Sequence, residues 1–321
     1  MVTGRAGVVI VTYNSAGAIG PCLDACHGLE IVVIDNASTD STEAEVLARP
    51  GVRFIRNLTN RGFASAVNQG VAAMDNSLVL LLNPDVRLLT SIDPLIAACQ
   101  EIDVGIATGQ LVDESGQAQR GFTIRRLPTP ASLAFEVLGL NRIFPRNPIN
   151  RRYRYLDFDL TQPADVEQPA GAFILFRRDL WEKLGGFDSG FHPIWFEDVD
   201  FCRRSLDLRY RTRYLPQVFA THQGGHSINN LEWSCRELYW YASLLRYACK
   251  HFSRCACREL SVVVMIAALL RTLEAIIFKR FRGRSGDIWR TYAGVVRLAA
   301  GCAVRGTFPQ PSEFGAPGSR Q

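Results

Sequence analysis

The sequence predicts an α/β protein with a mostly parallel central sheet. Three short segments are continuous runs of Val, Ile and Leu without alternating polar residues, a pattern typical of strands buried on both faces. Segments with helical character separate these runs, and strand-helix-strand alternation indicates a parallel sheet covered by helices. The expected strands are residues 7–14, 30–35 and 77–83, and the expected helices are residues 16–28, 39–48 and 64–74.

Each of the three apolar runs ends in polar residues, namely Thr12-Tyr13-Asn14, the segment 35–40 and Asn83-Pro84-Asp85. Any one of these clusters alone is more typical of a turn or a helix cap. Ligands of open α/β sheets, however, bind beyond the carboxyl ends of the strands. Three polar clusters at three consecutive strand ends therefore predict one shared site.

After the first three strands, the sequence predicts a long irregular segment and then further strands and helices. Residues 121–165 are rich in Arg, Pro and aromatic residues and show little periodicity, so we expect a long acceptor-binding loop over the active-site face. Strands are expected at 168–176 and 214–220, and helices at 178–184, 233–252, 259–280 and 285–300. The expected domains are a main domain 1–230, a helical extension 231–305 and a disordered tail 306–321.

The extension is basic, because residues 251–321 hold eleven Lys or Arg against four Asp or Glu. Its apolar run, residues 262–278, is interrupted by Arg271 and Glu274 and is too short to span a membrane. A basic stretch, residues 279–284, follows directly. We expect peripheral contact with an anionic membrane rather than with nucleic acid, while a helix packed on the main domain stays an open alternative.

The nine cysteines are scattered and odd in number, and none has the spacing of a zinc site. Residues 8–11 are too short for the apolar core of a secretory signal. We therefore expect reduced thiols and a cytoplasmic protein, held peripherally at the inner face of the cell membrane.

The strand-end residues suit the binding of a nucleotide diphosphate. A carboxylate such as Asp35, with Thr12 and Tyr13 beside it, accepts hydrogen bonds from a ribose or a base. Asp85 is the expected ligand for Mg²⁺ or Mn²⁺, which prefer carboxylate and phosphate oxygens. His222 or His226 is expected to complete a Mn²⁺ site, and Arg61 to contact the diphosphate.

The segment 195–200, Trp-Phe-Glu-Asp-Val-Asp, contains three acids among aromatic residues. Such acids are favoured at a helix N-terminus, and the following residues do predict a helix. Their density beside apolar side chains also predicts a general base, because a neighbouring acid and burial raise a carboxyl pKa. The three acids are Glu197, Asp198 and Asp200.

An ordered series of motifs resembles family 2 glycosyltransferases over about residues 7–227, and most closely their bacterial rhamnosyltransferase-like branch. The motifs are Val11-Thr-Tyr-Asn14, Val33-Ile-Asp-Asn-Ala-Ser-Thr-Asp40, Asn60-Arg-Gly-Phe-Ala64, Leu81-Leu-Asn-Pro-Asp85, Gly171-Ala-Phe173, Gly185-Gly-Phe-Asp188 and Glu197-Asp-Val-Asp-Phe-Cys-Arg203.

This resemblance implies a GT-A fold and an inverting transfer from a nucleotide-diphospho-sugar to a glycan or polyprenyl-linked acceptor, in cell-wall or surface polysaccharide synthesis. It implies that Asp198 is the general base, that Asp35 contacts the nucleoside, and that Asp85 and His222 bind the metal. The candidate donor-binding residues are Thr12, Tyr13, Asn14, Asp35, Asn36, Arg61, Gly62, Asn68, Asn83 and Trp195, and the candidate catalytic residues are Glu197, Asp198 and Asp200.

One motif departs from the family, since Asn83-Pro84-Asp85 replaces the common Asp-X-Asp. The rhamnosyltransferase-like branch shares this form, so it does not indicate inactivation. A dinucleotide-dependent oxidoreductase is excluded, because the turn after the first strand lacks Gly-X-Gly-X-X-Gly. A catalytically degenerate GT-A domain that binds glycan or scaffolds an assembly stays an alternative, although all three acids are present.

Overall fold

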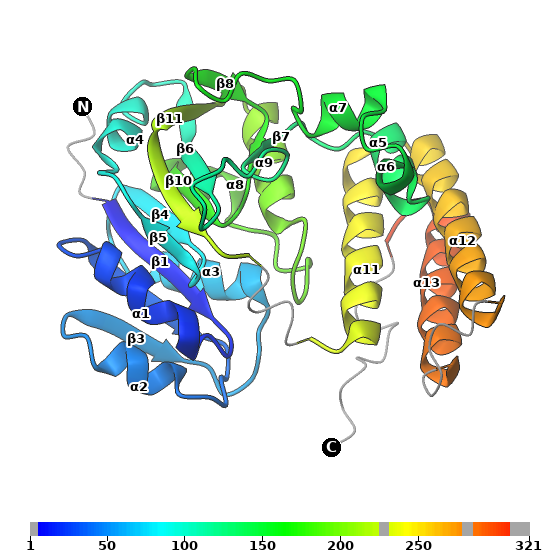
Figure 1. Ribbon diagram of the computed structural model, residues 1–321, viewed down its shortest axis with the longest axis horizontal. Coiled ribbons are helices and arrows are strands. Elements are labelled where there is room, and N and C mark those ends of the chain that lie inside the picture. Colours follow the sequence, from blue (N-terminus) through cyan, green and yellow to red (C-terminus); the bar gives the residue numbers. More distant parts are fainter. Residues whose placement is uncertain (1–5, 225–230, 278–284, 309–321) are drawn as a thin grey trace. The chain divides into compact units, whose positions relative to one another are not determined.

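The computed structural model describes residues 6–224, 231–277 and 285–308, which form two compact units. The first unit contains the central sheet and the second is helical (Figure 1). Residues 128–151 and 194–196 belong to the helical unit, although the sequence analysis placed them in the main domain. The predicted tail lies mostly outside the described residues, as do His226 and the basic residues 279–284.

The sheet has nine strands in the order β3-β2-β1-β4-β10-β6-β11-β5, with β8 paired to β11. Six of them, β1, β2, β3, β4, β6 and β11, run in the same direction. This confirms the predicted mostly parallel α/β fold. The strands are β1 (Ala6–Thr12), β2 (Glu30–Asp35), β3 (Val52–Arg56), β4 (Leu78–Leu82), β5 (Val86–Leu88), β6 (Val104–Val112), β8 (Ala164–Val166), β10 (Phe173–Arg177) and β11 (Arg211–His222).

Helices cover both faces of the sheet (Figure 1). On one face, Ile19 and Leu23 of α1 pack in the same cluster as Val8 of β1. On the other face, Gly70 of α3 lies so close to Val9 that an added Cβ would come within 2.5 Å of it. The helices of this unit are α1 (Ala16–Ala25), α2 (Thr42–Leu47), α3 (Phe63–Ala72), α4 (Asp93–Ala98), α8 (Arg178–Leu184) and α9 (Glu197–Asp207).

The expectation of an irregular loop at 121–165 was wrong. The segment contains the short strand β7 (Ile124–Arg125), paired with β9 (Gln168–Pro169) in a two-stranded sheet. It also contains three short helices, α5 (Pro130–Val137), α6 (Leu140–Ile143) and α7 (Pro148–Tyr153). Helix α5 begins with a capping box, because Thr129 and Ser132 each accept a hydrogen bond from the other's backbone N–H. Short amphipathic turns of this kind give too weak a periodicity to be recognised in sequence.

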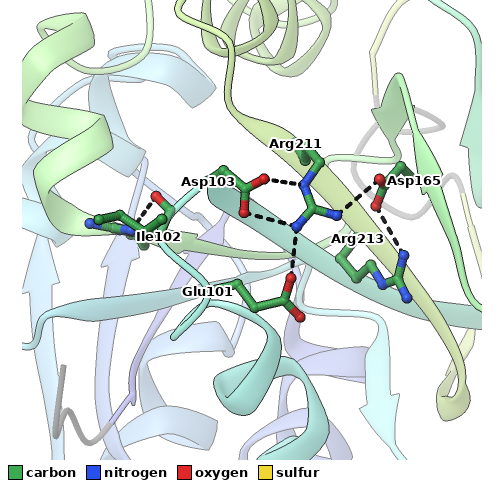
Figure 2. Close-up of polar contacts among 7 residues, drawn as sticks. Glu101, Ile102, Asp103, Asp165, Arg211 and Arg213 are labelled. Carbon is green, nitrogen blue, oxygen red and sulfur yellow. Dashed lines mark hydrogen bonds and ion pairs between the residues drawn. The ribbon is translucent and has the colours of Figure 1, made fainter. Parts of the chain in front are cut away.

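An ion network around Arg211 fixes the start of β11 (Figure 2). Its guanidinium donates two hydrogen bonds to Asp103, at 2.7 and 2.8 Å, and one to Glu101 at 2.7 Å. A further bond of 3.1 Å reaches Asp165 of β8, which also accepts from Arg213. These acids raise the pKa of Arg211. One cation thus joins the ends of β6, β8 and β11, and β11 carries His222 at its far end.

The second unit is a bundle of α11 (Trp233–His251), α12 (Arg254–Ile277) and α13 (Ser285–Arg305), which lie side by side (Figure 1). The inner face of α12 buries Leu260, Val264 and Ala268. Among the described residues, no helix combines the length and apolarity needed to cross a membrane. All nine cysteines of the chain are free thiols.

Candidate active site

The three predicted polar clusters meet at one edge of the sheet. Strands β1, β2 and β4 are parallel neighbours and end at Thr12, Asp35 and Leu82. Strand β10 is antiparallel to β4 and begins beside this edge, where the N–H of Asn83 donates to the carbonyl of Ala172 at 3.0 Å. The residues that follow β1, β2 and β4 therefore face the segment that precedes β10.

Asp35 is fully buried, and protein groups occupy its carboxylate. It accepts hydrogen bonds from the Thr12 hydroxyl at 2.9 Å, from the Ser38 N–H at 2.9 Å and from the Ser38 hydroxyl. These bonds hold the loop 35–38 against the end of β1. The contact of Asp35 with the nucleoside stays a prediction.

Asn14 and Asn36 tie neighbouring loops together. Asn14, with a left-handed φ of 51°, accepts a hydrogen bond from the Thr39 N–H at 2.8 Å. Asn36 donates to the carbonyl of Gly62 at 3.2 Å and is 3% exposed. Tyr13, which lies between these loops, is half-buried and its backbone N–H donates to Ser15. Tyr13 is thus less buried than Thr12 and Asp35, the last residues of the two strands.

Gly62 begins α3 in a conformation that requires glycine, with φ at 81°. A Cβ there would also lie 2.7 Å from His192 Nδ1, which is a second reason why position 62 requires glycine. Arg61 beside it is exposed and makes no hydrogen bond or ion pair with any described residue. Its guanidinium is thus available for an anionic ligand, as predicted for the diphosphate.

The oxygen and the nitrogen of the Asn68 side chain are both hydrogen-bonded within the protein. Its Oδ1 accepts from Trp181 Nε1 at 3.1 Å and from the Phe187 N–H at 2.9 Å, and its Nδ2 donates to the Phe187 carbonyl at 2.7 Å. These bonds anchor the turn after α8, where Gly185 ends the helix in a left-handed conformation. Asn68 therefore holds this turn, and its contact with the donor stays a prediction.

Asp85 and His222, the two predicted metal ligands, lie next to each other. Asp85 Oδ1 lies 3.6 Å from His222 Nε2, and the two side chains are 4% and 5% exposed. Burial lowers the pKa of His222, although the nearby carboxylate of Asp85 raises it. Phe122 stacks on the imidazole with ring centroids 5.0 Å apart. Asn83 is half-buried two residues before Asp85.

The residues present fit a divalent cation. In the described part of the chain, no three His, Cys, Asp or Glu side chains form a complete metal site. Mg²⁺-type sites, however, are usually built from one or two protein ligands plus substrate phosphates. A cavity of about 270 Å³ opens beside Asp85, lined also by Pro21 of α1 and by Arg87, Glu114 and Gln223. Asp85 thus borders open space, and His222 Nε2 lies 3.6 Å from its Oδ1.

Asp198 lies at the same edge of the sheet, because it contacts Gly171 and the adjacent Ala172 accepts from the Asn83 N–H. Its Oδ2 accepts hydrogen bonds from the Gly171 N–H at 2.8 Å and from Gln168 Nε2 at 3.4 Å, and its Oδ1 accepts from the Val199 N–H at 2.8 Å. Burial raises its pKa, while the two backbone N–H groups and Arg125 lower it. The carboxylate is held by donors yet partly exposed, as a general base requires.

The other two acids of α9 differ from Asp198. Glu197 is 5% exposed, its Oε2 has no hydrogen-bond partner among the described residues, and burial raises its pKa well above the usual range. Asp200 is fully buried and pairs with Arg204 Nε at 2.7 Å. Arg204 also donates to the carbonyls of residues 184 and 186. Burial therefore favours the protonated form of Glu197, whereas Asp200 is paired with Arg204.

Trp195 belongs to the residues 194–196 that are part of the helical unit, and its φ of 80° is strained for a non-glycine residue. Two hydrogen-bond partners of Asp198, Gly171 and Gln168, were not predicted from the sequence, and neither was the charge of Arg125 that acts on it. Gln119 and Phe122, which contact His222, were not predicted either. The Gly171-Ala-Phe173 motif indicated that Gly171 matters, but no sequence pattern indicated that its partner is Asp198.

The family pattern described as Glycosyl transferase family 2 matches residues 7–185, more than half of the chain. The N-acetylglucosaminyl-diphospho-decaprenol L-rhamnosyltransferase of Mycobacterium tuberculosis is 28% identical over 241 residues, which are 68% of this chain and 76% of that protein. The rhamnosyltransferase WbbL of Escherichia coli is 25% identical over 179 residues, 54% of this chain and 62% of that protein.

Among solved structures, the mannosyltransferase PcManGT from Pyrobaculum calidifontis, in complex with GDP-Man and Mn²⁺, has a similar fold. The TM-score is 0.52 at 17% identity, and the match covers 94% of this chain and 87% of that one. Both the sequence and the fold thus agree with the resemblance that the motifs carry. The chain belongs to glycosyl transferase family 2 and is a rhamnosyltransferase-like glycosyltransferase.

Proposed function

We propose that the protein transfers a sugar, with rhamnose as the first candidate, from a nucleotide-diphospho-sugar to a glycan or polyprenyl-linked acceptor with inversion at the anomeric carbon. The reaction serves the synthesis of cell-wall or surface polysaccharide. The names of the two rhamnosyltransferases described above support the choice of rhamnose and of a polyprenyl-linked acceptor. A degenerate, non-catalytic domain is not favoured, because all three acids of α9 are retained.

The observation that carries this proposal is a short chain of backbone contacts that links Asp198, the proposed base, to Asp85, a proposed metal ligand. Asp198 accepts from Gly171, and the next residue, Ala172, accepts from Asn83, two positions before Asp85. A donor whose diphosphate lies at Asp85 would thus have its sugar near Asp198. Asp35, Asn14 and Asn36 support this by fixing the loops on which the nucleoside would lie.

The transfer is a single displacement. Asp198 takes the proton of the acceptor hydroxyl as its oxygen attacks the anomeric carbon, and the bond from that carbon to the diphosphate breaks. The leaving nucleoside diphosphate keeps the bonding electrons. Arg61 contributes positive charge to this leaving group. A bound Mn²⁺ or Mg²⁺ would neutralise diphosphate charge, and Asp85 and His222 would hold it.

A panel of nucleotide sugars, assayed for release of nucleoside diphosphate by the full chain with Mn²⁺, tests the proposal. We expect slow hydrolysis of one donor without acceptor and faster release with a polyprenyl-diphosphate-linked acceptor. Asp198→Asn should lower both rates by at least about 100-fold. Asp207→Asn, at the exposed end of the same helix, should leave them unchanged. Equal activity of the two variants would contradict the role of Asp198.

Metal dependence is tested by chelation. EDTA should abolish release, and added Mn²⁺ or Mg²⁺ should restore it. Asp85→Asn should raise the Mn²⁺ concentration needed for half-maximal activity, while Asp93→Asn, an exposed acid on the same connection, should not. Full activity in EDTA after exhaustive dialysis would remove the metal from the mechanism.

We also propose that the protein works at the cytoplasmic face of the cell membrane and binds it peripherally. One face of α12 exposes apolar side chains that are 44 to 60% accessible, and the basic residues 279–284 follow it directly in sequence. Apolar area together with positive charge favours an anionic lipid surface. This apolar face of α12 consists of Val262, Ile266, Leu269, Leu270 and Leu273.

A further inference from the structure

The imidazole of His222 is held on three sides. Phe122 stacks on its face, Asp85 Oδ1 lies 3.6 Å from Nε2, and Gln119 Oε1 lies 3.0 Å from Nδ1. Gln119 makes a second contact with the same residue, because its Nε2 donates to the His222 backbone carbonyl at 2.7 Å. One amide therefore contacts both the ring and the main chain of His222.

The second contact fixes the orientation of the amide. A backbone carbonyl only accepts hydrogen bonds, so the NH₂ group of Gln119 must face it. The amide oxygen must then face the ring of His222. Since this oxygen also only accepts, the ring nitrogen opposite it, Nδ1, must carry the proton. A neutral imidazole has one N–H, so the lone pair is on Nε2.

The Nε2 lone pair faces Asp85 Oδ1, which is also an acceptor. Their separation of 3.6 Å is longer than a hydrogen bond. Asp85 is oriented as well, because its other oxygen accepts from the Gly224 N–H at 3.0 Å. Two ligands about 2.1 Å from one ion, at a right angle, lie about 3.0 Å apart. A small shift of either side chain therefore brings both to bonding distance of a divalent cation.

We propose that Gln119 is a positioning residue for this cation, because it fixes the His222 tautomer that presents a lone pair to the metal. The inference rests on the proposed metal dependence of the protein. Metal-bound histidines commonly donate their other N–H to such a partner, and loss of the partner typically costs 10- to 100-fold in metal affinity. Phe122 stacks on the face of the same imidazole and so restrains tilting of the ring plane. The contact between Gln119 and Nδ1 then fixes how the ring is turned within that plane.

A purely structural role for Gln119 makes a different prediction. The residue follows the hairpin after β6, and its backbone N–H already bonds the Leu111 carbonyl at 2.9 Å. If the side chain only fastened this hairpin to β11, every substitution that removed the bond to the His222 carbonyl would act alike. Gln119→Glu separates the two roles, since it keeps the acceptor for Nδ1–H and loses the donor.

The test measures Mn²⁺ binding to the full chain without nucleotide, by the electron paramagnetic resonance signal of free Mn²⁺. We expect Gln119→Leu to weaken binding 10- to 100-fold and Gln119→Glu to stay within a few-fold of wild type. Gln117→Leu, an exposed glutamine two residues away, should match wild type. Equal weakening in Gln119→Leu and Gln119→Glu would overturn the proposal in favour of the structural role.

Nitrogen-15 NMR of the metal-free protein reads the tautomer directly, with His222→Ala assigning the signal. Wild type should show the proton on Nδ1, and Gln119→Leu should show a mixture; a mixture in wild type would overturn the proposal without any metal. Wild-type affinity in His222→Ala would instead show that the metal pair itself is wrong. If His222→Ala weakens Mn²⁺ binding and Gln119→Leu does not, the proposed role of Gln119 is overturned and the metal pair is not.

Discussion

The backbone N–H of Gly171 donates a 2.8 Å hydrogen bond to Asp198 Oδ2, and a side chain at position 171 would fit only if Asp198 moved by a few tenths of an ångström. A Cβ built there would lie 3.0 Å from both Cβ and Oδ2 of Asp198. This contact joins the start of β10 to the start of α9, two elements that are far apart in sequence, and it orients the proposed base.

Gly171→Ala should therefore displace Asp198. We expect kcat for nucleoside diphosphate release to fall at least about tenfold, because small misplacements of a catalytic group are costly. KM for the donor should change less. Steady-state kinetics with the preferred donor measures both. Gly294→Ala in α13, where the added Cβ meets only Leu238 at 3.4 Å, is the matched control, and an unchanged kcat in Gly171→Ala would refute the positioning argument.

Arg125 should tune the same base. It lowers the pKa of Asp198 against the raising effect of burial, and its Nε is anchored to the Gly121 carbonyl at 2.8 Å. A base acts in its ionised form, so Arg125→Leu should raise that pKa and move the acid limb of the kcat/KM profile to higher pH. Arg125→Lys, which keeps the charge, should move it less. Identical profiles for all three proteins would argue against this coupling.

Glu197 should make stability depend on pH. Burial, with Asp198 and Asp200 nearby, raises the pKa of its carboxyl well above the usual range. The folded state therefore binds this proton more tightly than the unfolded chain. The resulting stability is complete below the unfolded pKa and is lost as pH rises through the folded pKa.

Glu197→Gln keeps a neutral side chain of the same shape at every pH. Its Tm should exceed that of wild type at alkaline pH, and the two values should converge in acid. Calorimetry across this range measures the difference. A gap that is independent of pH would mean that Glu197 is ionised in the folded protein, and the activity of the variant shows separately whether the Glu197 proton is used in the reaction.

The apolar face of α12 should bind anionic lipid. Leu269→Glu should lower the membrane-bound fraction roughly tenfold or more, since a leucine loses about 1.5–3 kcal/mol of burial. Co-sedimentation with phosphatidylglycerol vesicles, compared with phosphatidylcholine vesicles, measures it. Leu58→Glu, at a leucine that is 98% exposed in the first unit, should bind as wild type does. Wild-type self-association through this face without vesicle binding would point to a second copy as its partner.

The sequence alone was enough to predict the elements whose pattern is set by residues close together in the chain. The apolar runs gave β1, β2 and β4, because a strand buried on both faces needs little else to be recognised. The acids at the start of α9 were likewise evident from their spacing. Strand β3 was missed because its residues are half-exposed, and β6 because Gly105 and Gly109 break its apolar run.

Tertiary structure alone decided which side chains meet. Gln119 and His222 are 103 residues apart, and the buried partners of Asp35 and Asn68 became known only from the structure. Hydrogen-bond partners depend on the path of the whole chain through the sheet, which no local pattern encodes. The sequence by itself determined an α/β fold with polar strand ends and the acids proposed for glycosyl transfer. The packing of distant segments decided which other groups those acids contact.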